Sequence, residues 1–256
     1  MTEPEMLTGW TAADIRGEIW QRLKPVAKPD SRFHLDFGEV IPDFEGSDVA
    51  TSHLLAQGFT EGAKYVFITP DNGLVELRRR LLEAGATLVV STYGIRRGFV
   101  LLQPDRIPAG CALYAAWLDG LEHFGRSISL AEIKARGRFD FMVTGASAVS
   151  LNGVRFGKGH GYFDMEWGMF TDIGVVDEAT HVTALVHDVQ VVQDKLLPGP
   201  TDILVDSIAM PSRFLHVSRA ARPFGIKWEL LGEETIALTP PLGELREMQK
   251  EGRGLF

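Results

Sequence analysis

The stretch KYVFITPDNGLVELRRRLLEAGATLVVST, residues 64–92, decides the fold of this chain. Its first apolar run, 64–69, suits a strand, and the turn sequence 70–73 separates that run from residues with helical spacing. Gly85 is placed to end the helix, and residues 87–92 form a second apolar run. A strand, a helix and a strand in this order predict two parallel strands joined by a crossover helix.

Further segments on both sides of this unit extend the prediction. A helix is expected from Thr11, where Thr11 and Asp14 approximate a capping box, to a stop at Pro25. Residues 24–44 indicate a loop, and Ser47 is expected to cap a helix that stops at Gly58. The other expected helices are 111–123, which includes Trp117 as a core residue, and 129–136. The other expected strands are 99–102, 139–150, 182–186, 189–192, 203–209 and 214–217.

Composition excludes several classes of protein. The chain has 256 residues and a net charge of −8, which argues against broad binding to nucleic acid or to anionic membranes. Cys111 is the only cysteine, so no internal disulfide forms and no cysteine cluster supports a zinc site. Residues 1–10 lack the apolar core of a signal peptide, and no run of about 18 apolar residues occurs. A cytoplasmic location is the resulting expectation.

The most distinctive loop is GVRFGKGHGYFD, residues 153–164. Its glycines allow tight turns whose backbone N–H groups attract anions. Arg155 and Lys158 add positive charge and Asp164 adds a carboxylate, so the loop suits a polyphosphate with a divalent metal. The spacing matches neither the Walker A pattern nor the dinucleotide fingerprint, and a purely structural turn is the alternative. Asp71 also follows a predicted strand, so it and the loop are expected to share one crevice.

The run RFGKGHGYFD, residues 155–164, resembles the signature of the 5-formyltetrahydrofolate cyclo-ligase family (methenyltetrahydrofolate synthetases), roughly Arg-Leu-Gly-x-Gly-x-Gly-Tyr-Tyr-Asp. Weaker similarities follow the family's order and cover most of residues 11–217. They lie at Ile15 and Arg16, at the strand 139–143, and at Gln190, Pro198, Asp202, Val205 and Asp206. Residues 219–256 look like an extension found in a divergent branch of the family.

The resemblance implies an α/β fold of three layers (α/β/α) with a mostly parallel, Rossmann-like central sheet. It implies a single domain over residues 1–256 with 219–256 as a C-terminal extension. The implied activity is an ATP- and Mg²⁺-dependent ligase that converts 5-formyltetrahydrofolate, a reduced folate, to 5,10-methenyltetrahydrofolate. No membrane or nucleic-acid partner is implied, and the oligomeric state stays open.

The resemblance also implies roles for single residues. Arg155 and Lys158 are expected to act in catalysis by neutralising phosphate charge, and Asp164 and Asp202 to hold Mg²⁺. Asp71 lies closest to the family's folate-binding Glu, and Tyr162 is a second expected folate contact. The expected ATP contacts are Arg16, Arg155, Phe156, Gly157, Lys158, Gly159, His160, Gly161, Tyr162, Phe163 and Asp164.

Plainer interpretations stay open for several of these residues. Arg16 can equally lie on a solvated helix face, Asp164 can cap the next helix, and Asp202 can belong to a turn. Tyr162 and Phe163 can be core residues. The basic run at 78–80 is typical of a solvated helix face.

Two departures from the family pattern favour an alternative function. Ala12 stands where the family has an N-terminal Lys, and Met165 stands where many members have a basic residue. The alternative is a regulatory member that binds nucleotide or folate without turnover. A kinase-like enzyme acting on another small substrate is a third hypothesis.

Overall fold

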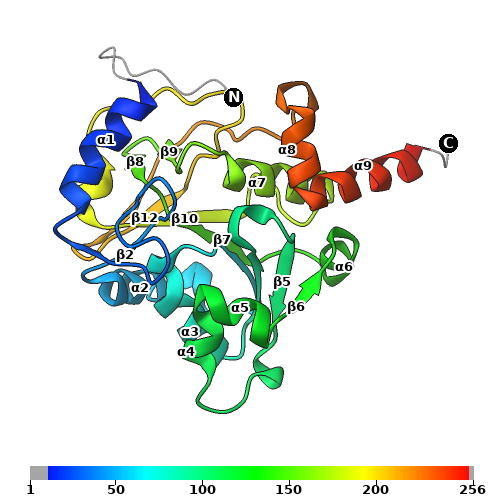
Figure 1. Ribbon diagram of the computed structural model, residues 1–256, viewed down its shortest axis with the longest axis horizontal. Coiled ribbons are helices and arrows are strands. Elements are labelled where there is room, and N and C mark those ends of the chain that lie inside the picture. Colours follow the sequence, from blue (N-terminus) through cyan, green and yellow to red (C-terminus); the bar gives the residue numbers. More distant parts are fainter. Residues whose placement is uncertain (1–10, 254–256) are drawn as a thin grey trace.

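A central sheet of eight strands organises the computed structural model, which describes residues 11–253 (Figure 1). Five neighbouring strands run parallel, and the three outermost pairings are antiparallel. In spatial order the strands are β13 (Phe214–His216), β12 (Ser207–Ala209), β10 (His181–Leu185), β7 (Phe141–Thr144), β3 (Tyr65–Ile68), β4 (Thr87–Ser91), β5 (Phe99–Leu102) and β6 (Arg126–Ile128). The expected mostly parallel α/β sheet is confirmed.

Helices cover both faces of this sheet and complete the three layers (Figure 1). One apolar core lies under α2 (Ser47–Leu55), α3 (Val75–Glu83), α4 (Ala112–Ala116) and α5 (Leu118–Phe124). The core on the other face is formed with α6 (Leu130–Arg136), α7 (Tyr162–Asp172), α8 (Glu233–Leu238) and α9 (Pro240–Arg253). Short 3₁₀ turns lie at Gly58–Thr60, Asn72–Leu74, Tyr93–Ile95, Pro104–Arg106, Asp188–Gln190 and Trp228–Leu230.

A smaller unit stands beside the main sheet and carries the glycine loop. Its three strands, in the order β11 (Val191–Val192), β8 (Ala148–Ser150) and β9 (Arg155–Phe156), pack against α1 (Ala12–Leu23) through a separate apolar cluster. The capping box predicted at Thr11 and Asp14 begins α1. Two very short strands, β1 (Ala27–Lys28) and β2 (Asp43–Phe44), pair within the expected loop region 24–44.

The strand–helix–strand unit predicted at 64–92 is confirmed. β3 and β4 pair in parallel with Tyr65 opposite Thr87, and α3 crosses between them. Leu74, Leu77 and Leu81 are all buried, as their helical spacing predicts.

The single strand expected over 139–150 is wrong, because the chain changes sheets there. β7 ends at Thr144 and β8 begins at Ala148 in the smaller sheet. Gly145 lies at the break, and a Cβ on it would stand 2.8 Å from Oδ2 of Asp71. The backbone therefore approaches this carboxylate more closely than any residue with a side chain allows.

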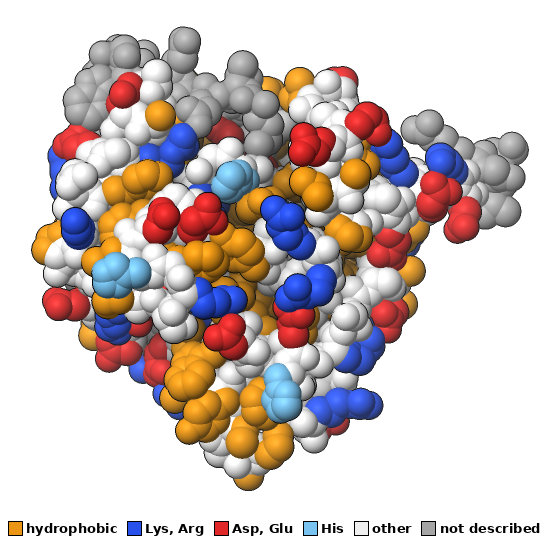
Figure 2. Space-filling view, viewed as in Figure 1, with side chains coloured by type: hydrophobic (Ala, Val, Ile, Leu, Met, Phe, Trp, Pro, Cys, Tyr) orange, Lys and Arg blue, Asp and Glu red, His pale blue; other side chains and the backbone are white. Residues whose placement is uncertain are grey.

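The single buried helix expected over 111–123 is also wrong. α4 ends at Ala116, Trp117 is extended, and α5 follows. The two helices meet so closely that a Cβ on Gly120 would lie 1.7 Å from the carbonyl oxygen of Tyr114. Trp117 is 46% exposed rather than in the core, and Figure 2 shows hydrophobic side chains gathered at the lower end of this face, over these helices.

Other expected boundaries shift by a few residues. Gly46, with φ +79°, occupies the N-cap of α2 in place of Ser47, and the helix ends at Leu55 rather than near Gly58. The strand expected at 189–192 is a 3₁₀ turn followed by the two residues of β11. The strand expected at 203–209 keeps only its last three residues, as β12.

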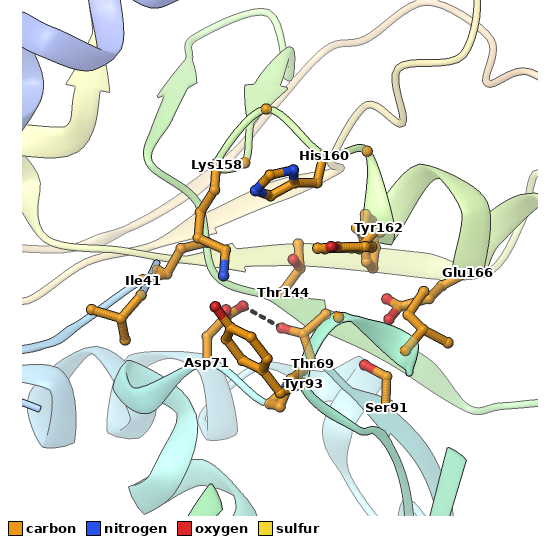
Figure 3. A pocket seen from close by; sticks show the side chains of 18 of the residues that line it. Ile41, Thr69, Asp71, Ser91, Tyr93, Thr144, Lys158, His160, Tyr162 and Glu166 are labelled. Atoms are coloured by element: carbon orange, nitrogen blue, oxygen red, sulfur yellow. Dashed lines mark hydrogen bonds between the residues drawn. The ribbon is translucent and has the colours of Figure 1, made fainter. Parts of the chain in front are cut away.

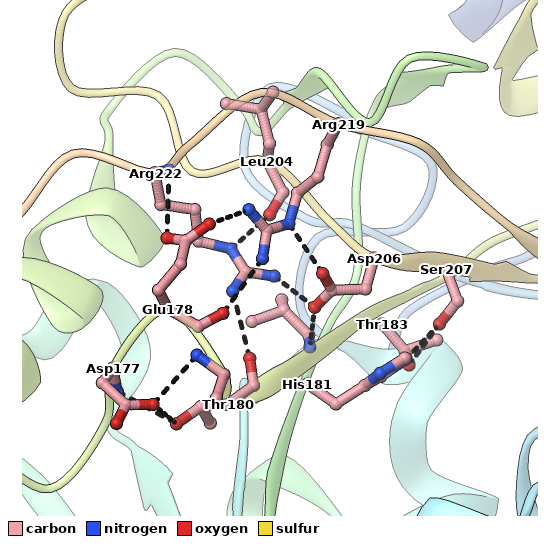
Figure 4. A network of polar contacts seen from close by, with 12 residues as sticks. Asp177, Glu178, Thr180, His181, Thr183, Leu204, Asp206, Ser207, Arg219 and Arg222 are labelled. Carbon is pink, nitrogen blue, oxygen red and sulfur yellow. Dashed lines mark hydrogen bonds and ion pairs between the residues drawn. The ribbon is translucent and has the colours of Figure 1, made fainter.

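The segment after residue 219 packs onto the core. Ile236, Leu242 and Leu245 belong to the same apolar cluster as α7. The Arg222 guanidinium is fully buried and forms an ion pair with Asp206 (Figure 4). It also lies 4.8 Å from the centre of the Trp167 ring. No helix within residues 11–253 is long and apolar enough to cross a membrane. The expectation about a signal peptide concerns residues 1–10, which lie outside the described range.

Candidate functional site

A cavity of about 340 Å³ opens where β3, β4 and β7 end (Figure 3). Thr69, Ser91 and Thr144, from the carboxyl ends of these strands, line its floor. Asp71 and the glycine loop both line it as well, so the shared crevice expected from the sequence is confirmed. The position is the usual one for a ligand in a parallel α/β sheet.

The glycine loop joins β9 to α7 along one side of this pocket. Gly159 and Gly161 have φ values of +104° and +64°, which residues with a side chain rarely adopt. Gly161 is the N-cap of α7, so the positive end of the helix dipole and its unpaired N–H groups border the pocket. These features together favour an anionic ligand at the loop.

Three cations surround the loop. Arg16 is only 9% exposed and lines the pocket, so a solvated-surface interpretation of this residue is wrong. Its Nη2 lies 3.6 Å from where a Cβ on Gly159 would stand. Arg155 is buried, and its Nε donates to the carbonyl oxygen of Gly145 over 3.3 Å.

The side chain of the third cation, Lys158, extends across the pocket. Its Nζ donates to the carbonyl oxygen of Glu39 at 2.6 Å and lies 4.6 Å from the ring centre of Tyr93 (Figure 3). Burial lowers the pKa of its ammonium group, and the charges of Asp71 and Glu39 oppose that shift. Lys158 therefore links the glycine loop to the chain segment at the opposite wall.

Asp164 and Asp202 supply carboxylates next to the loop. Oδ1 of Asp164 accepts a hydrogen bond from the backbone N–H of Ile203 (3.0 Å) and lies 3.8 Å from Nη1 of Arg155. Burial raises the pKa of Asp164 to about 6, Arg155 opposes the rise, and Asp202 adds to it. Oδ2 of Asp202 accepts from the backbone of Gly199 at 2.8 Å.

This acidic pair has the composition of a magnesium site. Among residues 11–253 there is no group of three or more His, Cys, Asp or Glu side chains that could hold a metal ion. Mg²⁺ needs fewer protein ligands, because it usually keeps waters and takes one or two carboxylates together with substrate phosphates. Asp164 and Asp202, which both line the pocket beside the loop, fit that requirement.

Asp71 is held firmly at the opposite wall. Its Oδ2 accepts from Oγ1 of Thr69 at 2.6 Å and from the backbone of Gly145 at 3.0 Å. Arg78 lies beneath it, 0% exposed, and donates to the carbonyl oxygens of Asp71, Thr69 and Ala116. The solvated-face interpretation of the basic run is therefore wrong for Arg78.

The aromatic residues of the loop divide between core and pocket. Phe163 is buried in an apolar cluster, as its plainer interpretation predicts, and Phe156 is buried in another, although both also line the pocket. The Arg155 guanidinium lies 4.8 Å from the Phe163 ring centre. Tyr162 is half-buried with its ring 5.2 Å from that of His160, whose pKa is lowered by burial and by neighbouring cations.

Sequence reasoning missed one ionisable group in the wall. Glu166 is 1% exposed and lines the pocket from α7. Burial raises the pKa of its carboxyl group to about 8, and a hydrogen bond with Ser91 opposes the rise. The signal was its position, because a glutamate interrupts the otherwise apolar run from Met165 to Phe170. The pocket also includes Glu39, Thr69, Ser91 and Thr144, which carried no sequence signal.

Comparison with known proteins decides the family. A sequence model of the 5-formyltetrahydrofolate cyclo-ligase family matches residues 10–211. The chain belongs to this family. The resemblance seen in the glycine loop is thereby confirmed, and the enzymes of the family use ATP.

Curated proteins from two mammals are similar to this chain over nearly its whole length. The methenyltetrahydrofolate synthase domain-containing proteins of Mus musculus and Bos taurus are 31% and 29% identical over 251 residues, 96% of this chain. The chain spans 66% and 65% of the length of these relatives.

A solved structure supports the fold. The NMR structure of Aquifex aeolicus 5,10-methenyltetrahydrofolate synthetase matches with a TM-score of 0.51 at 17% identity. The match covers 86% of this chain and 98% of that protein.

Proposed function

We propose that this protein is an ATP- and Mg²⁺-dependent 5-formyltetrahydrofolate cyclo-ligase. One observation carries the proposal: the cation-rich glycine loop and the Asp71 wall line a single cavity at the carboxyl ends of the parallel strands. A bisubstrate phosphoryl transfer needs such an arrangement, because the two substrates must meet in one water-excluding space. We also propose that the chain is a single domain with residues 219–256 as its extension.

The glycine loop binds the triphosphate of ATP. Backbone N–H groups at Gly159 and Gly161 bind phosphate oxygens, and the helix dipole of α7 adds to the attraction. Arg16 and Arg155 bind the phosphates through their guanidinium groups, and Lys158 acts as a point charge. Asp164 and Asp202 hold Mg²⁺, which supplies charge neutralisation at the phosphates when it is bound.

The reduced folate lies between this loop and the opposite wall. Its formyl oxygen attacks the γ-phosphate of ATP, releasing ADP. N10 of the folate then attacks the formyl carbon and loses its proton to water, the phosphate leaves, and the ring closes. Asp71 and Tyr162 hold the folate, and the cations of the loop stabilise the charge that develops on the transferred phosphate.

Binding without turnover is the second candidate, and two positions favour it. Ala12 lines the pocket where the family has a lysine, so one cation is missing beside the phosphates. Met165 is buried in the core and adds no charge there. In this second candidate the protein binds the same ligands but does not catalyse the reaction between them.

A direct assay separates the two candidates. The protein is mixed with 5-formyltetrahydrofolate, Mg²⁺ and ATP, and the absorbance of methenyltetrahydrofolate is followed, with a reaction lacking ATP as the reference. An ATP-dependent rise supports the ligase; ATP binding without that rise supports the non-catalytic candidate. Arg16→Ala is expected to slow the reaction, whereas Arg22→Ala, an exposed arginine of the same helix, is the matched control.

A further inference from the structure

The first part of the C-terminal extension is joined to the helix that begins at the glycine loop. This part, residues 223–231, is called the α7-binding segment below, and the family model ends before it. Nε1 of Trp167, on α7, donates to the carbonyl oxygen of Pro223 at 2.9 Å. Two backbone N–H groups of the segment donate to the side chains of Thr171 and Asp172, each at 2.9 Å. The segment therefore contacts α7 over much of its length.

The segment and the helix approach most closely at Gly168, in the middle of α7. A Cβ on Gly168 would stand 2.8 Å from Cδ1 of Ile226 and 3.2 Å from the carbonyl oxygen of Gly225. Glycine weakens a helix interior relative to alanine. At this position the chain thus has close contact with the segment in place of a more stable helix.

This contact reaches the carboxylate that is proposed to hold Mg²⁺. Asp164 lies one helical turn before Gly168 on α7. A second cavity, of about 20 Å³, is lined by Asp164 and Ile203 together with Ile226 and Leu231 of the segment. Asp164 also lines the main pocket, so its carboxylate stands between that pocket and the segment.

A magnesium ligand is sensitive to small displacements. Mg²⁺ requires near-octahedral geometry with oxygen ligands at about 2.0–2.1 Å. Changes to the groups that support a metal ligand typically alter metal affinity about 10–100-fold. The attraction of phosphates to a helix N-terminus varies more gradually with distance, because it arises from a dipole and several N–H groups. A small shift of α7 should therefore weaken the magnesium site more than the phosphate site.

We propose that the α7-binding segment is a positioning element for Asp164. By fixing α7 through Trp167 and Gly168, it holds the Asp164 carboxylate where Mg²⁺ and the phosphates of ATP meet. The identity of these ligands rests on the proposed function. The segment acts through the helix alone, since none of the described residues 223–231 lines the main pocket.

The measured quantity is the gain in ATP affinity that Mg²⁺ provides, which is the ratio of the ATP dissociation constants without and with Mg²⁺ in calorimetry. Gly168→Ala should lower this ratio about tenfold, because its methyl group displaces the segment. Adding Ile226→Val removes the Cδ1 methyl nearest to the new Cβ and should restore most of the ratio. Gly243→Ala is the matched control, because Gly243 lies in α9 of the same extension and a Cβ there has no neighbour within 4 Å.

The ratio separates positioning from a merely structural role. Loss of folded protein would reduce the number of binding sites and leave the ratio unchanged. The proposal is overturned if Gly168→Ala keeps the wild-type ratio, or if ATP affinity falls equally with and without Mg²⁺. Should Gly168→Ala fail to fold, Trp167→Phe removes the hydrogen bond to Pro223 and should also lower the ratio. An unchanged ratio in that variant overturns the proposal as well.

The binding measurement does not depend on turnover. If no methenyltetrahydrofolate forms but Mg²⁺ raises ATP affinity and Gly168→Ala reduces that gain, the ligase proposal fails and the positioning proposal stands. If the protein converts 5-formyltetrahydrofolate while Gly168→Ala leaves the ratio unchanged, the positioning proposal fails and the ligase proposal stands. A wild-type ratio near one overturns the positioning proposal without any variant.

Discussion

Replacing Glu166 by glutamine should stabilise the protein, and by more as the pH rises. The carboxyl group has a pKa of about 8 in the folded protein and an ordinary value of 4.5, and burial is the main cause of the rise. Between these two pH values the unfolded chain releases the proton and the folded chain keeps it. The free energy of unfolding of the wild-type protein therefore falls as the pH rises through this window.

The size of the effect follows from the two pKa values. Each pKa unit corresponds to about 1.4 kcal/mol, so the buried glutamate costs about 3 kcal/mol at about pH 7 and about 1 kcal/mol at about pH 5. Glutamine does not ionise, so Glu166→Gln should gain about 2 kcal/mol over the wild type between those pH values. Urea unfolding followed by circular dichroism at both pH values measures this difference.

The difference in free energy of unfolding between the variant and the wild type reports on Glu166, because most other titrating groups contribute equally to both proteins. Glu61→Gln, at an exposed position, should change stability equally at both pH values. A difference between Glu166→Gln and the wild type that stays constant with pH would refute the reasoning. It would mean that Glu166 ionises normally in the folded protein.

Three more substitutions test other parts of the structure. Lys158→Ala should weaken ATP binding about tenfold in calorimetry, as expected for one lost charge-assisted contact; unchanged affinity would show that Lys158 serves only its contact with Glu39. Gly161→Ala should destabilise the protein by about 1–2 kcal/mol, because its φ of +64° is left-handed, and should weaken ATP binding. Retained affinity there would remove the loop from the phosphate site. Arg222→Ala should cost about 1–3 kcal/mol in thermal unfolding, because it removes the ion pair with Asp206 and leaves the carbonyl oxygens of Leu204 and Thr180 without their buried donor; a loss below about 0.5 kcal/mol would contradict a structural role for Arg222.

Local sequence patterns predicted the features that depend on neighbouring residues. The capping box at Thr11 and the parallel pairing of β3 with β4 both follow from residues close together in the chain. The glycine loop was found in the same way, because its turns and its charges lie within twelve residues, 153–164.

Long-range contacts account for what the sequence did not reveal. The strand expected over 139–150 breaks at Gly145 because Asp71, distant in the chain, packs against it. Arg78 is buried rather than solvated because carbonyl groups at Thr69 and Ala116 surround it. Glu166 belongs to the pocket wall because α7 packs over the sheet, and no local sequence pattern shows that packing.

The transfer of oxygen from folate to phosphate tests the central claim most directly. The protein is supplied with ATP, Mg²⁺ and 5-formyltetrahydrofolate that carries a heavy oxygen isotope in its formyl group, and the released phosphate is analysed by mass spectrometry. Because the formyl oxygen attacks the γ-phosphate in the proposed reaction, one heavy oxygen should appear in each phosphate released. Phosphate without the label, or no ATP-dependent phosphate release at all, would contradict the account.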